Sequence, residues 1–212
     1  QSKFNNTIQE GSSAAGGMLS QIKKIAVAVG GLATVKKLVD LSDDLSSTKA
    51  RLNLIVDDGG SVTELEQKIM ASAQRSRASY LTTAKAISQM GLMAGDAFAN
   101  NDELIAFTET LNKAFVNVGA GTQQIEAATL QLTQAMASGV LRGEELNSVF
   151  ENAQPVIQAI ADYLGEPIGK IRTLAAEGKI TADIVKNSLL MAADALYSAD
   201  SDSSSEISIL IL

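Results

Sequence analysis

The stretch GVLRGEELNSVFENAQP at residues 139–155 places a helix end and a helix start close together. Gly139 is expected to end one helix, because glycine adopts without steric cost the left-handed conformation that follows many helices. Pro155 is expected to open the next helix, since a proline in the first turn loses no hydrogen bond. The related segment AAEGKITADIVKNSLL at residues 175–190 repeats this order, with Gly178 after one helix and Thr181 capping another. This order predicts short helices joined by tight turns.

Helix signals of the same kind extend outward from this stretch. Ser61 and Glu64 match a capping box, in which each side chain accepts a hydrogen bond from a backbone N–H of the other residue. Residues 100–103, Asn-Asn-Asp-Glu, form a second N-terminal signal, and Thr122 is expected to cap a further helix. Between them, one apolar stripe contains Leu104, Leu111, Phe115 and Val118. Every segment with a clear period repeats near 3.6 residues, and none alternates as a strand does. The sequence therefore predicts an all-α fold, a compact multi-helix domain with an extended N-terminal helical arm.

The segment Gly91-Leu-Met-Ala-Gly95 has the spacing of small residues that lets helices approach closely in membranes. Its neighbours are not apolar enough for a bilayer. A tight turn between soluble helices is therefore the favoured interpretation.

The predicted organisation has four parts. Residues 1–17 form a flexible lead-in, residues 18–56 a helical arm, residues 57–197 a compact helical domain, and residues 198–212 a disordered tail or a fragment boundary. The arm carries a narrow apolar seam, which includes Ile22, Ile25, Val29 and Leu32. Two interpretations stay open: the arm pairs with another chain as a coiled coil, or it folds back on its own domain. Because the chain begins at Gln1 and not at Met, we expect it to be a piece of a longer protein.

Composition excludes several classes of function. The chain has no His and no Cys, which rules out disulfides, thiolate nucleophiles, imidazole bases and zinc sites with nitrogen or sulfur ligands. Its net charge of −7 argues against a nucleic-acid-binding surface, which needs clustered Lys and Arg. No phosphate-binding loop occurs. We therefore expect no cofactor, no metal site and no direct nucleic-acid binding.

Acidic residues near the opening stretch are the only candidates for acid–base chemistry. Glu144, Glu145 and Glu151 surround the first turns of a short predicted helix, where acidic side chains stabilise the helix dipole. No nucleophile or partner base accompanies them, so we expect no enzyme. Arg142, with Asn147 and Asn152 at helical spacing, could belong to a buried polar network or a partner contact, or simply to an exposed loop that enters a helix.

Several segments together resemble the N-terminal domain of phage tail tape measure proteins. The main ones are LRGEELNSVFENAQPVIQAIADYLG at residues 141–165 and LAAEGKITADIVKNSLL at residues 174–190. Upstream, the resemblance includes YLTTAKAISQMGLMAGDAF, TLNKAF and TLQLTQAMASG, and in all it covers residues 38–197. It implies a structural module of a long helical protein, encoded by a phage or a prophage, which lies inside the tail tube and sets tail length.

The resemblance also implies partners and marks signature residues. Expected partners are other copies of the chain, tail-tube subunits and tail assembly chaperones, with the bacterial cytoplasm as the place of assembly. The residues that match the signature are expected to be structural, and they are Leu141, Arg142, Gly143, Glu144, Asn147, Glu151, Pro155, Glu177, Gly178 and Lys179. An alternative function is membrane contact through residues 16–39 during DNA ejection, since this Gly- and Ala-rich segment carries Lys pairs. A peptidoglycan-cleaving enzyme is least favoured, because no catalytic Glu with sugar-stacking aromatic residues is recognisable.

Overall fold

The computed structural model describes residues 40–142, 147, 149, 151 and 153–193. The chain divides into two units, residues 1–47 and 48–212. In the first unit, residues 40–47 are helical. The expectations for the lead-in, for the seam of the arm and for residues 198–212 lie outside the described residues.

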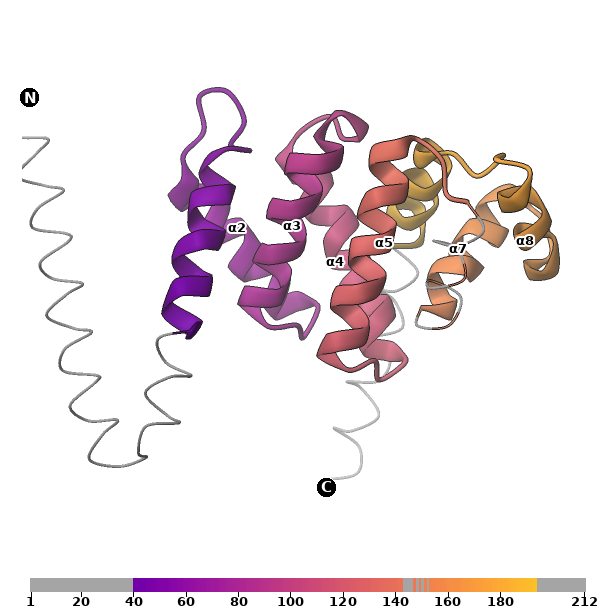
Figure 1. The fold of residues 1–212 in the computed structure, drawn as a ribbon, viewed down its shortest axis with the longest axis horizontal. Coiled ribbons are helices and arrows are strands. Elements are labelled where there is room, and N and C mark those ends of the chain that lie inside the picture. The colour runs from indigo at the N-terminus through magenta and orange to yellow at the C-terminus, as the bar shows by residue number, and fades with distance from the viewer. Residues whose placement is uncertain (1–39, 143–146, 148, 150, 152, 194–212) are drawn as a thin grey trace, which may run out of the picture. The chain divides into compact units, whose positions relative to one another are not determined.

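The second unit is built from helices, which confirms the all-α prediction (Figure 1). Residues 48–53 and 182–193 are helical. The other helices are α2 (Val62–Arg75), α3 (Tyr80–Ala94), α4 (Asn101–Asn117), α5 (Thr122–Ser138), α7 (Gln154–Leu164) and α8 (Ile168–Ala176), with a short 3₁₀ helix η1 (Gly95–Ala97) after α3. Among the described residues, the only extended pairing is an isolated antiparallel bridge between Val140 and Thr181.

Helix starts follow the capping residues in the sequence. The Ser61 hydroxyl accepts a hydrogen bond from the Glu64 N–H at 3.2 Å, and the Asn100 side chain accepts one from the Glu103 N–H at 2.9 Å. Both predicted helix starts are confirmed. The prediction that Thr122 caps α5 is wrong by one position: Gly121 is the N-cap, and its N–H donates to the Gln124 side chain at 3.0 Å.

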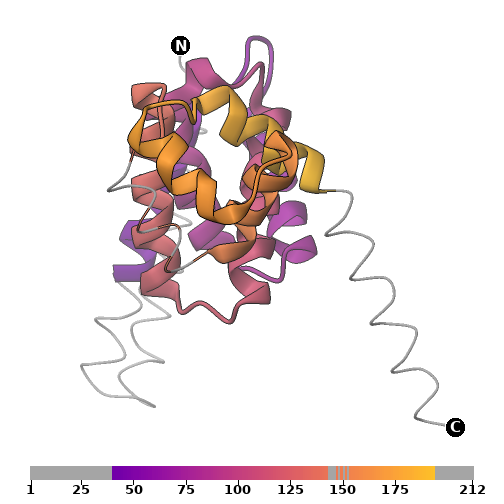
Figure 2. The ribbon, with the colours of Figure 1, turned by 90° about the vertical axis from the view of Figure 1, so that its right-hand side faces the viewer.

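Helix α3 packs on α2, α4 and α5, and α2 also packs on α4. The direction of α2 relative to α4 follows from two ion pairs. Lys68 binds Asp102 and Arg75 binds Glu109, and each pair joins residues 34 apart in the sequence. A constant offset means that α2 and α4 run parallel. In Figure 2, the orange and yellow helices α7, α8 and residues 182–193 lie in front of helices α2 to α5.

Helix α4 is the centre of the core. Every residue from 104 to 115 except Ala106 is buried, so the helix is covered on nearly all sides. Phe107 contacts Phe98 edge-on, with ring centroids 5.3 Å apart. Val118, expected on the apolar stripe of this helix, is 47% exposed because α4 ends at Asn117 and Val118 is already its C-cap.

The two glycines of the Gly91–Gly95 motif have different surroundings. Gly91 lies inside α3, where a Cβ atom would be 2.7 Å from Ile55 Cδ1 and 3.2 Å from Leu104 Cδ2. Gly95 is the C-cap of α3, and a Cβ there would meet nothing within 4 Å. The spacing therefore reflects a close approach at Gly91 alone, where α3 meets Ile55 in the bend after residues 48–53 and Leu104 on α4.

Replacing Gly91 with valine is expected to lower the free energy of unfolding by about 1–3 kcal/mol, because the added methyl groups overpack the contact with Ile55 and Leu104. Chemical denaturation followed by circular dichroism measures the change. Gly95→Val is the matched control, with an expected change within about 0.5 kcal/mol. Equal losses in the two variants would contradict the close approach at Gly91.

Candidate functional site

The two segments that carry the expected signature residues meet in the fold. The Leu141 N–H donates to the Ile180 carbonyl at 2.7 Å, and the Ala182 N–H donates to the Gly139 carbonyl at 2.9 Å. These bonds flank the antiparallel bridge between Val140 and Thr181. Residues 139–141 and 180–182 are called here the signature bridge.

Glycines in the left-handed conformation lead both segments into the signature bridge. Gly139 ends α5 with φ +81°, and Gly178 follows α8 with φ +69°, as the sequence predicts. Only glycine adopts such angles readily, so each helix stops where the chain must turn. After the bridge, the Thr181 hydroxyl accepts a hydrogen bond from the Ile184 N–H at 3.3 Å. This bond confirms Thr181 as the cap of the next helix.

The signature bridge is anchored in the core. Leu141 is 1% exposed and Ile180 is fully buried, and both belong to the main hydrophobic cluster. Buried backbone groups need hydrogen-bond partners, and the bridge supplies them where neither segment is helical. The signature bridge therefore joins the end of α5 to the start of the last described helix.

The remaining described signature residues lie nearer the surface. Arg142, Asn147 and Glu151 are exposed, and the Asn147 side chain accepts a hydrogen bond from Arg172 Nη1 at 3.2 Å. Pro155 lies in the first turn of α7, as predicted. Gly143, Glu144, Glu145 and Asn152 lie outside the described residues.

Glu177 and Lys179 form an ion pair on the surface. Their charged atoms are 2.7 Å apart, and the two side chains are 48% and 64% exposed. Such a pair adds little to stability in water. Among the described residues, no group of three or more acidic side chains could hold a metal ion. The described part of the signature thus combines buried backbone pairing with exposed polar side chains.

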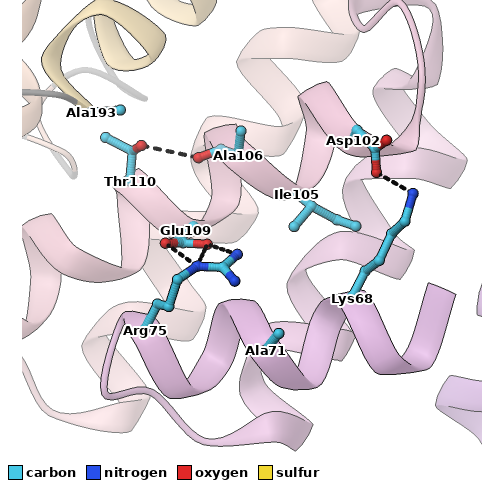
Figure 3. A pocket seen from close by; sticks show the side chains of 9 residues that line it. All are labelled: Lys68, Ala71, Arg75, Asp102, Ile105, Ala106, Glu109, Thr110 and Ala193. Carbon is cyan, nitrogen blue, oxygen red and sulfur yellow. Dashed lines mark hydrogen bonds and ion pairs between the residues drawn. The ribbon is translucent and has the colours of Figure 1, made fainter. Parts of the chain in front are cut away.

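A buried charge cluster between α2 and α4 has no counterpart in the sequence analysis. Arg75 Nη2 lies 2.6 Å from Glu109 Oε2, and Lys113 Nζ lies 3.5 Å from Glu109 Oε1 (Figure 3 shows the Arg75–Glu109 pair). The Glu109 and Lys113 side chains are only 3% and 7% exposed. Buried charges are costly unless they are paired. Glu109 therefore offsets the cost of burying the Lys113 ammonium.

Two titratable groups near α2 have raised pKa values. The hydrogen bond from Lys68 to Asp102 raises the pKa of the exposed Lys68 ammonium. Partial burial, with a smaller contribution from the Glu66 charge, raises the pKa of the Tyr80 phenol.

The raised pKa of Tyr80 predicts a loss of stability in alkaline solution. Above pH 10.0, the ordinary pKa of the phenol, the unfolded chain releases the Tyr80 proton more readily than the folded chain does. The contribution of Tyr80 is therefore complete below that pH and disappears as the pH rises through the folded-state pKa. In Tyr80→Phe, the free energy of unfolding should fall less steeply above about pH 10, as denaturant titrations at several pH values would measure. Identical slopes in both proteins would contradict this assignment.

Comparison with known families shows the family of this chain. A family model described as "Tape measure protein" matches residues 36–208. The chain belongs to the tape measure protein family. The match confirms the resemblance and extends past residues 38–197 at both ends. No curated protein and no solved structure matches the chain.

Membership of the tape measure family makes this chain a structural protein of a phage tail. The signature bridge and the buried charge cluster both lie within the matched residues. In the described part of the chain, no helix has the length and apolar character needed to cross a membrane.

Proposed function

We propose that the chain is a non-enzymatic module of a tape measure protein, which acts in tail assembly and tail-length determination inside the tail tube. The family match over residues 36–208 carries this proposal. The described signature residues support it. They form a buried backbone junction with exposed side chains around it, and this is a structural arrangement without a nucleophile or a paired base. In this role, the signature bridge keeps the helices after α5 in place.

The proposed partners are other copies of the chain, tail-tube subunits and tail assembly chaperones, which would meet it in the bacterial cytoplasm. Self-association is supported by Leu41 and Leu45, which are 45% and 40% exposed on helical residues 40–47. Residues four apart lie on one helix face, so these leucines give that face an apolar surface. The coiled-coil interpretation of the arm rests mainly on residues outside the described part of the chain.

An in-frame deletion of residues 48–193 in the phage or prophage gene tests the proposal. If the module is part of the ruler, tails should shorten, by at most about 1.5 Å per deleted residue, the rise of a continuous α-helix. Tail lengths and tail numbers are measured on negatively stained particles. Normal numbers of full-length tails would overturn the proposal, whereas loss of all tails would support the assembly role.

A second set of variants separates folding from length. Leu141→Ala keeps the number of residues but weakens the signature bridge, whereas Arg142→Ala changes only an exposed neighbour. We expect fewer tails of normal length with Leu141→Ala, and wild-type tails with Arg142→Ala. The alternative, membrane contact through residues 16–39, concerns a segment outside the described residues. Co-sedimentation with liposomes, with and without residues 1–37, would test it.

A further inference from the structure

A cavity of about 310 Å³ lies at the bend after residues 48–53, against the end of α3 and the start of α4. Among its lining residues, Leu104 is buried, whereas Leu54 and Leu92 are 72% and 46% exposed. No other large apolar side chain in the described part of the chain is as exposed as Leu54. This space is called here the Leu54–Leu92 cavity. Apolar surface that is open to solvent at a concave site is typical of a contact for a partner.

Gly95 keeps the Leu54–Leu92 cavity open. It lines the cavity, and a Cβ atom there would meet nothing within 4 Å. Its backbone angles, φ −55° and ψ −38°, are those of an ordinary right-handed helix, so a larger residue fits without strain. The glycine therefore leaves space for a side chain that comes from outside the domain.

The charge around the cavity is negative. Asp57 lines it, Asp58 and Asp96 are chain neighbours of its lining residues, and all three are exposed. No described Lys or Arg forms an ion pair with any of these three carboxylates. The cavity also adjoins the C-terminal end of α3, which is the negative end of its dipole, and the last turn of α3 carries no basic residue. The site therefore favours a cation.

The two lysines nearest to these elements already have partners. Lys68 donates a hydrogen bond to Asp102 at 2.6 Å. Lys186 donates one to the Ala97 carbonyl at 2.9 Å and lies 3.7 Å from Glu103. The negative charge at the cavity is thus left to a cation of a partner, which electrostatic complementarity would guide to the site.

We propose that the Leu54–Leu92 cavity docks a segment of another protein in which a large aliphatic side chain adjoins a lysine or an arginine. The aliphatic side chain covers the two exposed leucines and enters the space beside Gly95, and the cation faces Asp57. The same carboxylates repel a nucleic acid or an acidic lipid surface. This docking does not depend on the proposed role in tail length, so either can fail without the other.

Selection from a displayed library of random peptides tests the proposal, with the immobilised 212-residue chain as the target. The enriched peptides are expected to share an aliphatic residue flanked by Lys or Arg. Their affinity, measured by fluorescence anisotropy, should fall by about tenfold or more in Gly95→Val, which fills the cavity. Gly169→Val is the matched control, because Gly169 on α8 also has open space at its Cβ position and does not line the cavity. Circular dichroism checks that both variants are folded.

A second pair of variants tests the charge. Asp57→Asn removes the negative charge but keeps an oxygen that accepts the hydrogen bond from the Asn101 N–H, 2.9 Å away. Asp162→Asn makes the same change of charge on α7, at an acceptor for Gln158 that does not line the cavity. Only Asp57→Asn is expected to weaken binding, by about threefold at low salt and by less at high salt.

Three outcomes of the selection overturn the proposal: no enrichment, enrichment of acidic or uncharged peptides, and equal binding of the enriched peptides to the wild-type chain and to Gly95→Val. Analytical ultracentrifugation tests for a second copy in the cavity. Self-association that Gly95→Val abolishes would also overturn the proposal, because a second copy would then occupy the site in place of another protein.

Discussion

Replacing Glu109 with alanine is expected to lower the free energy of unfolding by about 3–5 kcal/mol. The variant removes a carboxylate that is 3% exposed and contacts both Arg75 and Lys113. Lys113 is itself 7% exposed, so its ammonium would stay buried after losing this partner. Urea denaturation followed by circular dichroism measures the loss, in the 212-residue chain at neutral pH.

Asp102→Ala is the matched control for Glu109→Ala. Asp102 also lies on α4 and also binds a cation of α2, but its pair with Lys68 is 68% and 54% exposed. Exposed pairs contribute about 1 kcal/mol or less. A double variant that adds Lys113→Met removes the second buried charge, and it should recover part of the loss. Equal losses from Glu109→Ala and Asp102→Ala would contradict a buried charge cluster.

Local signals in the sequence predict where most of these helices begin and end. Ser61, Asn100 and Thr181 cap helices as expected, and Gly139 turns in the left-handed conformation. These features depend on hydrogen bonds within a few residues, so residue type is enough to identify them. Gly121, which replaces Thr122 as a cap, shows the limit: adjacent candidates differ by too little for sequence to separate them.

Burial of the polar residues on α4 could not be predicted in the same way. The stretch from Thr108 to Lys113 is typical of a solvated helix face, because all of its six residues except Leu111 are polar or charged. It is buried because α2, α3 and α7 all pack against α4. That packing joins residues far apart in the chain, and no periodicity within one helix indicates it. The local signal for this burial is the spacing of Glu109 and Lys113, four residues apart, and such pairs are common on exposed helices.

The signature bridge, too, is only partly predictable from the sequence. Gly139 and Gly178 predict the two turns, but the pairing of Leu141 with Ile180 joins positions 39 apart. The resemblance places the expected signature residues in both segments, and the structure shows that the segments touch.

Replacing Leu141 with alanine is expected to lower the free energy of unfolding by about 2–5 kcal/mol. The side chain is 1% exposed in the main cluster, and truncation leaves a cavity beneath the signature bridge. The backbone bond from Leu141 to Ile180 is kept in alanine, so the loss measures packing alone. Denaturant unfolding measures the loss in the free energy of unfolding. Hydrogen exchange at Leu141 and Ala182, whose N–H groups form the signature bridge, shows whether the bridge opens before the rest of the unit.

Arg142→Ala is the control for Leu141→Ala, because Arg142 is the next residue and is exposed. Its expected effect is within about 0.5 kcal/mol. If the signature bridge anchors the helices after α5, Leu141→Ala should speed amide exchange more in residues 182–193 than in α2. Helix α2 takes no part in the hydrogen bonds of the bridge. Uniformly faster exchange over both regions would mean that Leu141 stabilises the whole unit and that the bridge has no separate anchoring role.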